Sequence, residues 1–196
     1  MIRKKHILQI SYHTCPLASE EGKESGGMNI YVNELSRHLA RAGHHVDVIT
    51  RYQSPTEAKI VEVEPRLRVI HLPAGPVSAI PKKELLSFIP EFVQSFQDWS
   101  TETGTTYDII HAHYYQSGLI GLRINESRKE KLPMVMTFHT LALMKNLVAR
   151  SVEEQESDAR LDAEFRLTKD ASVIIAPSTS DAEYLTYLYG VPEKNI

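Results

Sequence analysis

The chain has 196 residues, 42% of them hydrophobic and 24% charged, and its net charge is -3 at pH 7. This composition is ordinary for a globular protein with one substantial core, and the weak negative charge gives no reason to expect a nucleic acid or an anionic membrane as partner. The single cysteine, Cys15, excludes a disulfide within the chain, and no apolar run is long enough to span a membrane. We therefore expect a cytoplasmic protein.

Short apolar runs and amphipathic stretches alternate along the chain, which is typical of an α/β domain. The runs predict strands over His6–Tyr12, His45–Thr50, Lys59–Val63, Arg68–Leu72, Ile109–His113, Met134–Phe138 and Val173–Ala176. The stretches between them predict helices from a glycine pair to about Arg41 and over Lys82–Ser100, Gln116–Ser127, Asp158–Lys169 and Ser180–Leu188. Repeated strand–helix–strand units imply a doubly wound, mostly parallel, Rossmann-like sheet.

Two long polar segments interrupt this alternation. Thr14–Ser25 leads into the glycine pair and is predicted to be either a mobile ligand loop or an ordinary surface loop. Lys145–Glu156 follows the end of a strand. The last residues, Val191–Ile196, look like the beginning of a further strand. We therefore expect residues 1–196 to form one domain of a longer protein.

The glycine pair, Gly26 and Gly27, stands between the first predicted strand and an amphipathic helix. Without a Cβ, its backbone N–H groups can approach a ligand closely. The helix behind it offers unpaired N–H groups and the positive end of its dipole, and both favour an anion such as phosphate. The pair is therefore predicted to form an anion cradle.

Histidines follow three of the predicted strands, at the edge where an open parallel sheet binds its ligands. His13 follows the first strand, His113-Tyr114-Tyr115 comes at the end of another, and His139-Thr140 follows a third. The fold would bring these residues together beside the glycine pair. Because His111 and His113 alternate along one strand, they face the same side of the sheet.

Three other chemistries fit these residues less well. A zinc site would want the His-x-x-x-His spacing of a helix or help from cysteines, and a serine hydrolase would want Gly-x-Ser-x-Gly; the sequence has neither. The dinucleotide fingerprint Gly-x-Gly-x-x-Gly also fails, because Gly26 and Gly27 are adjacent and Asn29 and Ile30 stand where glycines are needed. We expect no metal site in this chain.

Four cationic side chains could complete an anion site: Lys82, Lys83, Lys145 and Arg160. Most lysines and arginines are solvated surface groups. Arg160 lies four residues before Glu164 on a predicted helix, a spacing that equally suits a simple surface ion pair. Charge alone does not choose among the four.

Motifs spread over the whole chain resemble the amino-terminal half of the retaining glycosyltransferases of family 4. They are His13-Thr14-Cys15-Pro16-Leu17, Ser25-Gly26-Gly27-Met28-Asn29-Ile30-Tyr31, Thr50-Arg51, Ala74-Gly75-Pro76, Tyr107-Asp108-Ile109-Ile110-His111-Ala112-His113-Tyr114 and His139-Thr140-Leu141-Ala142. Within that family the match is nearest to the enzymes that glycosylate inositol phosphate, with sucrose-phosphate synthases a little further off.

The resemblance implies the GT-B fold, in which this half holds the acceptor and a carboxy-terminal half binds the nucleotide sugar. It implies that Gly26 and Gly27 contact the donor diphosphate and that His139 lies against the transferred sugar as a catalytic residue. The residues it assigns to the acceptor and its phosphate are His13, Asn29, Lys82 (or, with a one-residue shift, Lys83), Tyr114, Thr140 and Arg160.

The function that follows is retaining transfer of a hexosyl group from a nucleotide sugar, expected to be UDP-linked, to a phosphorylated polyol or sugar such as inositol phosphate. Transfer to fructose 6-phosphate and a non-catalytic module that binds a phosphorylated metabolite are the alternatives. The partners expected are the two substrates and a carboxy-terminal domain of the same protein, with a homodimer as an option. This half needs no cofactor, although Mg²⁺ can accompany the nucleotide sugar, and alone it is expected to be inactive.

Overall fold

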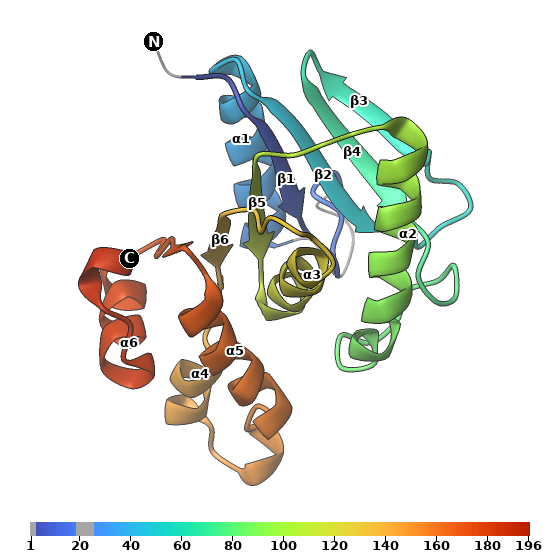
Figure 1. Cartoon of the computed structure of the whole chain (residues 1–196). Coiled ribbons are helices and arrows are strands. Elements are labelled where there is room, and N and C mark those ends of the chain that lie inside the picture. The colour runs from blue at the N-terminus through green and yellow to red at the C-terminus, as the bar shows by residue number, and fades with distance from the viewer. Residues whose placement is uncertain (1–2, 19–25) are drawn as a thin grey trace.

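The computed structural model describes residues 3–18 and 26–196 (Figure 1). A 7-stranded sheet runs through its centre in the order β3-β4-β2-β1-β5-β6-β7. The strands are β1 (His6–Ile10), β2 (His45–Arg51), β3 (Ile60–Glu64), β4 (Leu67–Leu72), β5 (Ile109–His113), β6 (Met134–Thr137) and β7 (Val173–Ile174). Only β3, paired with β4, is antiparallel to its neighbour in this described sheet.

Six α-helices are assigned within the described residues: α1 (Gly27–Arg41), α2 (Ile89–Thr103), α3 (Tyr115–Glu126), α4 (Ala142–Val148), α5 (Asp158–Asp170) and α6 (Thr179–Tyr189). Short 3₁₀ turns are η1 (Leu85–Phe88), η2 (Val152–Glu154) and η3 (Glu193–Asn195). The predicted doubly wound, mostly parallel fold is thus confirmed. None of the helices described has the length and apolar character needed to cross a membrane.

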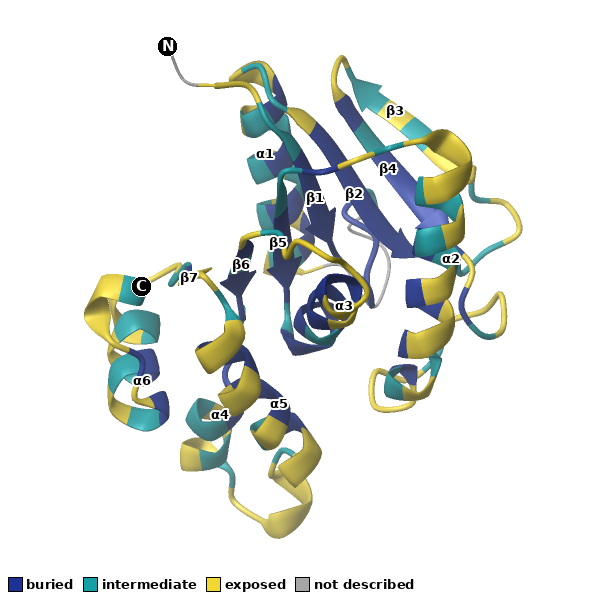
Figure 2. Cartoon of the chain, in the orientation of Figure 1, coloured by how far each residue is buried: buried dark blue, intermediate teal, exposed yellow. Residues whose placement is uncertain are grey.

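The helices cover both faces of the sheet, with α1 on one face and α2 and α3 on the other (Figure 1). Strand alternation explains this division. Ile7 of β1 packs in a cluster with Val32 of α1, whereas Leu8 and Ile10 belong to the larger core that contains Phe92 of α2. The inner strands β1, β2, β4, β5 and β6 are accordingly buried along almost their whole length, whereas the edge strand β3 is exposed or half-buried throughout (Figure 2).

Three local predictions differ from the structure, and a fourth is not tested by it. The helix predicted from Lys82 begins later, as η1 followed by α2, because Pro90 suits the first turn of a helix and breaks its interior. The segment predicted as purely polar contains α4, and the expected strand at Val191–Ile196 is instead η3. The ligand-loop prediction falls mainly on residues 19–25, which lie outside the described residues.

The strand order in the sheet places β1 between β2 and β5. The connection from β1 to β2 and the connection from β5 to β6 therefore run in opposite directions across the sheet. A crevice between such connections, beyond the carboxyl ends of the strands, is where open α/β sheets bind ligands. The predicted site residues follow β1, β5 and β6, and the topology therefore brings them to one edge.

Candidate functional site

The chain leaves β1 through a tight turn that an asparagine of α1 holds in place. Asn29 is buried, and its Nδ2 donates to Thr14 Oγ1 at 2.8 Å and to the Cys15 carbonyl at 3.0 Å. Ser11 Oγ closes the turn by donating to the Thr14 carbonyl at 2.8 Å. Asn29 thus shapes the turn that carries His13, a role that the sequence did not indicate; its predicted contact with the acceptor stays a prediction.

The glycine pair occupies the start of α1, and the described fold gives no steric reason for glycine there. Gly26 is extended, with φ -157°, and Gly27 is the first residue of the helix. A Cβ built on either glycine meets no described atom within 4 Å. No described side chain caps this end of α1, and its first turn has no acidic residue. As far as the described residues go, the helix end therefore keeps the positive potential and the space for a close approach that an anion cradle needs.

Two residues at the carboxyl edge have strained backbones. Tyr114, directly after β5, has φ 74°, and His139, just after β6, has φ 63°. Left-handed φ is uncommon for residues other than glycine, and it persists where the surroundings impose it, often at functional sites. The other such non-glycine residue in the described chain, Arg66, lies in the turn between β3 and β4. The two strained positions at this edge are therefore candidates for ligand contact.

Two buried histidines of β5 and the half-buried His139, which follows β6, form a continuous row on the α1 side of the sheet. The rings of His111 and His113 are 4.2 Å apart, which confirms that they face one side, and His113 Nδ1 lies 3.1 Å from His139 Nε2. Tyr31 of α1 contacts the His139 ring at 5.2 Å and so connects this row to the helix behind the glycine pair. Burial lowers the pKa of His139 to about 4 despite the opposing charge of Asp181. His139 is thus neutral at pH 7.

His13 is buried next to positive charge. Its exposed fraction is 6%, and its ring lies 4.7 Å from that of Tyr114. Burial first, then the positive charge of Lys82, lowers the pKa of His13 to about 3. Its Nδ1 is buried and has no hydrogen-bond partner among the described residues. A buried polar atom without a hydrogen-bond partner lowers the stability of the fold unless a ligand or water bonds to it. This ring nitrogen is therefore a candidate for a hydrogen bond to a ligand.

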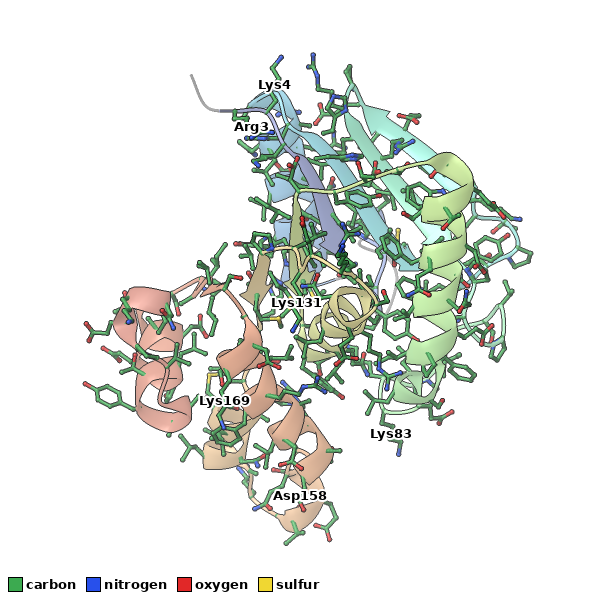
Figure 3. The ribbon with its side chains drawn as sticks, viewed as in Figure 1. Arg3, Lys4, Lys83, Lys131, Asp158 and Lys169 are labelled. Carbon is green, nitrogen blue, oxygen red and sulfur yellow. The ribbon has the colours of Figure 1, made fainter. Side chains whose placement is uncertain are left out.

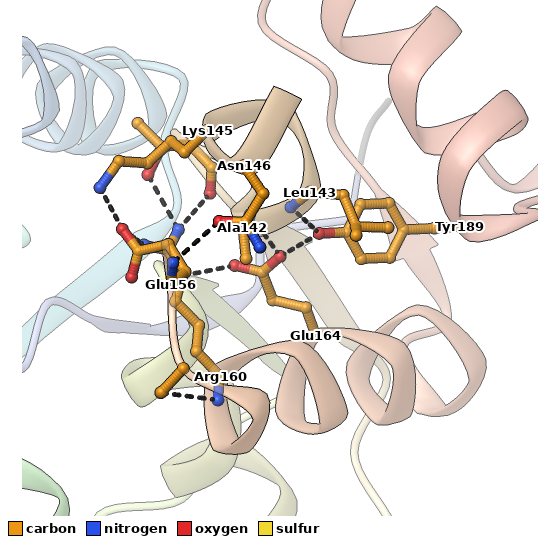
Figure 4. Close-up of polar contacts among 10 residues, drawn as sticks. Ala142, Leu143, Lys145, Asn146, Glu156, Arg160, Glu164 and Tyr189 are labelled. Carbon is orange, nitrogen blue, oxygen red and sulfur yellow. Dashed lines mark hydrogen bonds and ion pairs between the residues drawn. The ribbon is translucent and has the colours of Figure 1, made fainter. Parts of the chain in front are cut away.

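Arg160 of α5 lies at the centre of the polar network in Figure 4. It is 2% exposed, its Nε donates to Glu164 Oε1 at 2.8 Å, and its Nη2 donates to the Thr140 carbonyl at 3.0 Å and to Thr140 Oγ1 at 3.1 Å. Nη1 lies 2.9 Å from Glu156 Oε1. The pairing with Glu164 that the sequence allowed is real, but it is not a surface pair, because both side chains are buried.

Glu164, itself on α5, connects this network to α4 and α6. Its exposed fraction is 0%, and its Oε2 accepts hydrogen bonds from the Ala142 backbone N–H at 2.8 Å and from the Tyr189 hydroxyl. Ala142 begins α4 and Tyr189 ends α6. A fully buried carboxylate held on both oxygens fixes the direction of the Arg160 guanidinium, so the cation is positioned before any ligand arrives.

Tyr114 connects Arg160 to His13. The Arg160 Cζ lies 5.0 Å from the centre of the Tyr114 ring and 5.2 Å from that of Tyr115, distances at which a guanidinium is attracted by an aromatic face. Burial raises the pKa of Tyr114 to about 12, although the Arg160 charge opposes the shift. The Tyr114 hydroxyl therefore keeps its proton at pH 7 and is available as a donor to an anion.

Lys82 approaches this edge from the loop before η1. Its carbonyl accepts a hydrogen bond from Gln116 Nε2 at 2.6 Å, which anchors it to α3. Its ammonium is exposed and has no hydrogen bond or ion pair with the described residues, yet its charge acts on His13. Lys83 instead points away from the molecule (Figure 3). Of these two lysines, the structure places Lys82 at the site.

The structure thus joins His13, Tyr114, Thr140 and Arg160 through direct contacts and adds Lys82 through its charge. Sequence reasoning found the pairing with Glu164 but missed its burial, and it missed the second carboxylate, Glu156. The spacing of Glu156 was a usable signal, because it lies four residues before Arg160 just as Glu164 lies four residues after it. No cluster of three or more metal-ligating side chains occurs in the described parts of the chain, and the association of Mg²⁺ with the donor stays a prediction.

Three known proteins are similar to this chain in sequence or in structure. D-inositol 3-phosphate glycosyltransferase of Corynebacterium aurimucosum is 35% identical over 190 residues, which are 97% of this chain and 45% of that protein. Sucrose-phosphate synthase from Thermosynechococcus elongatus superimposes with a TM-score of 0.84 at 34% identity, over 93% of this chain and 44% of that one. The catalytic domain of Arabidopsis thaliana starch synthase IV, at 12% identity and TM-score 0.62, covers 98% of this chain and 50% of that one and shares the fold alone.

The chain therefore spans slightly less than half the length of its curated relatives. It has the α/β architecture of one half of a GT-B glycosyltransferase. Residues 25–196 match the family Glycosyltransferase Family 4. Since this match covers most of the chain and agrees with the fold, the chain belongs to Glycosyltransferase Family 4.

Proposed function

We propose that residues 1–196 form the amino-terminal, acceptor-binding domain of a retaining glycosyltransferase. The enzyme would transfer a hexosyl group from a nucleotide sugar, UDP-linked, to a phosphorylated polyol or sugar, with inositol phosphate as the first candidate. A carboxy-terminal domain would hold the nucleotide sugar. The relatives named D-inositol 3-phosphate glycosyltransferase support this choice of acceptor.

The observation that carries the proposal is the cluster of phosphate-binding groups at the carboxyl edge. Arg160 is oriented by Glu164 and bonded to Thr140, Tyr114 lies beneath the guanidinium, and the Lys82 ammonium has no partner among the described residues. Charged donors together with hydroxyls are the strong ligands of a phosphomonoester. The unpartnered Nδ1 of His13 offers a contact for a hydroxyl of the same acceptor.

The mechanism we propose rests on positioning. The acceptor phosphate anchors one end of the acceptor, so that its attacking hydroxyl meets the anomeric carbon near His139. Gly26 and Gly27 would donate backbone hydrogen bonds to the donor diphosphate and stabilise the charge that develops on it as the sugar leaves. The departing phosphate then accepts the proton of the acceptor hydroxyl on the same face. Neutral His139 would contact the sugar without adding a charge.

A second acceptor, fructose 6-phosphate, is favoured by one observation. The structural neighbour with a TM-score of 0.84 is a sucrose-phosphate synthase, at an identity close to that of the inositol phosphate enzymes. A thermal-shift panel of inositol phosphate, fructose 6-phosphate, unphosphorylated inositol and UDP separates the two. A ligand at 100 times its Kd adds about 2.7 kcal/mol to the free energy of unfolding. Stabilisation by unphosphorylated inositol alone would contradict the proposal.

Adjacent lysines provide the sharpest test. In the enzyme with both halves, Lys82→Ala should raise the KM for the phosphorylated acceptor by about tenfold, because one charge-assisted hydrogen bond is lost. The KM for the nucleotide sugar should change little. Lys83→Ala is the matched control, since it removes the same charge one residue away. Equal effects of Lys82→Ala on both KM values, or a larger effect of Lys83→Ala, would contradict the assignment.

A further inference from the structure

One carboxylate oxygen holds two cations at the proposed phosphate site. Glu156 Oε1 lies 2.9 Å from Arg160 Nη1 and also accepts from Lys145 Nζ of α4 (Figure 4). The remaining groups of Arg160 face Glu164 and Thr140. Nη1 is therefore the part of the guanidinium that faces Glu156 and that a ligand could take over by exchange.

The two carboxylates around Arg160 differ in how easily they could leave. Glu164 has a side-chain exposure of 0% and is bonded through both oxygens, whereas Glu156 is 20% exposed. The Glu156 backbone N–H donates to Asn146 Oδ1 at 2.8 Å. Because this bond fixes the backbone, the Glu156 side chain can rotate towards solvent without unfolding the segment.

Charge balance favours such an exchange. Lys82, Lys145 and Arg160 carry three positive charges, and Glu156 and Glu164 carry two negative ones, so the site as it stands has one positive charge in excess. A phosphate dianion bound beside Thr140, which is exposed, would leave a net negative charge as long as Glu156 stayed in place, whereas the departure of Glu156 would restore neutrality. Like charges this close repel one another, and partial exposure to water weakens that repulsion without removing it.

We propose that the Glu156 carboxylate occupies the phosphate site in the free protein and is displaced from it when the acceptor phosphate binds. The phosphate then takes over Arg160 Nη1 and Lys145 Nζ, so Lys145 becomes a phosphate ligand. A dianion compensates for the lost carboxylate, whereas a monoanion only replaces one single charge by another. Glu156 is thus a specificity-determining residue that favours dianionic acceptors. This inference rests on the proposed function of the site.

Inorganic phosphate is a suitable probe, because calorimetry on this chain measures its binding without the other half. Glu156→Gln should bind phosphate about tenfold more tightly than the wild type, and it should bind the monoanion acetate, which the wild type discriminates against. Glu153→Gln is the matched control: it removes the same charge from a neighbouring exposed position and should change the affinity little. In the enzyme with both halves, Glu156→Gln should lower the KM for the phosphorylated acceptor and not that for the donor.

A purely structural Glu156 would give the opposite result. If Glu156 only supports Lys145 and Arg160, Glu156→Gln weakens phosphate binding or leaves it unchanged, and the proposal is overturned. Lys145→Met covers the case in which Glu156→Gln fails to fold. Lys145 is 48% exposed, and its loss should weaken phosphate binding by about tenfold, with Lys83→Met as control; no change would contradict its role as a ligand.

Failure of the proposed function gives a different pattern. If phosphate binds neither the wild type nor Glu156→Gln, or binds equally to Lys82→Ala, the phosphate site itself is wrong and both proposals fall. If phosphate binding depends on Lys82 but not on Glu156 or Lys145, only the exchange at Glu156 is overturned.

Discussion

Both ends of the sheet carry buried polar groups, but these groups differ in how far they find hydrogen-bond partners within the fold. At the amino end, Asp47 of β2 accepts hydrogen bonds from Arg68 Nε at 2.8 Å, from Arg68 Nη2 at 2.7 Å and from the Tyr107 hydroxyl at 2.9 Å. Burial by itself would raise the pKa of Asp47, but hydrogen bonds from His6, Arg68 and Tyr107 outweigh it and lower the pKa to about 2. The Asp47 carboxylate thus has a charged or polar donor at both of its oxygens.

At the carboxyl end the matching is incomplete. His13 Nδ1 has no described partner, and Tyr114 and His139 have strained backbones. Burial also lowers the pKa of His13 and of His111 without a nearby carboxylate to oppose the shift. Unmatched groups and strain cost stability, and they are typical of places where a ligand completes the structure. The difference teaches that the amino end stabilises the fold, whereas the carboxyl end is built for binding.

Breaking the amino end should give the largest loss of stability. Asp47→Asn leaves Arg68 and the Tyr107 hydroxyl without their charged acceptor, and we expect the free energy of unfolding to fall by about 3 kcal/mol in urea titrations. Phosphate binding should not change. Asp108→Asn, at the same end but with its side chain 36% exposed, should have a much smaller effect. Weakened phosphate binding with unchanged stability in Asp47→Asn would contradict the distinction between the two ends.

The two ends should also lose their contributions to the free energy of unfolding at different pH values. Burial lowers the pKa of His111 from 6.5 to about 3, so between these values the unfolded chain binds more protons and stability falls as the pH falls. Each such histidine should cost about 2 kcal/mol between pH 7 and pH 5. The contribution of Asp47, whose pKa is lowered from 3.8 to about 2, should persist until the pH drops below 3.8.

His111→Gln tests this pH dependence. The variant should reduce the loss of unfolding free energy between pH 7 and pH 5 by about 2 kcal/mol, whatever its stability at pH 7. His38→Gln, at an exposed position of α1, is the control and should leave the slope as in the wild type. An unaltered slope in His111→Gln would show that the carboxyl end does not govern acid sensitivity.

Substitutions of two glycines test the comparison further. The smallest change in stability is expected for Gly27→Ala. Gly27→Ala adds a Cβ where no described atom lies within 4 Å, so stability should stay equal or rise by about 0.5 kcal/mol. Affinity for the nucleotide sugar in the enzyme with both halves should fall by at least about tenfold if the cradle holds the diphosphate. In Gly118→Ala the new Cβ would lie 2.6 Å from Leu167 Cδ1, so stability should fall while the cradle is untouched. Unchanged donor affinity in Gly27→Ala would overturn the cradle.

Much of this site could be predicted because its signals are local. The strand before His13 and the helix after the glycine pair are visible from periodicity, and strand alternation already put His111 and His113 on one side. The contribution of α4 was missed because Ala142–Val148 is a short helix whose N-terminus depends on a distant carboxylate, that of Glu164. Short helices have little stability of their own, so sequence patterns predict them poorly.

The sequence by itself determined the α/β alternation, the parallel sheet and the edge at which the polar residues collect, because these depend on periodicities of two and 3.6 residues. Only the tertiary structure decided how those residues are used. It buried Arg160 between two carboxylates, left Lys82 exposed at the edge of the site and made Asn29 the support of the turn after β1. Pairing and burial depend on which distant elements pack together, and no local spacing encodes that.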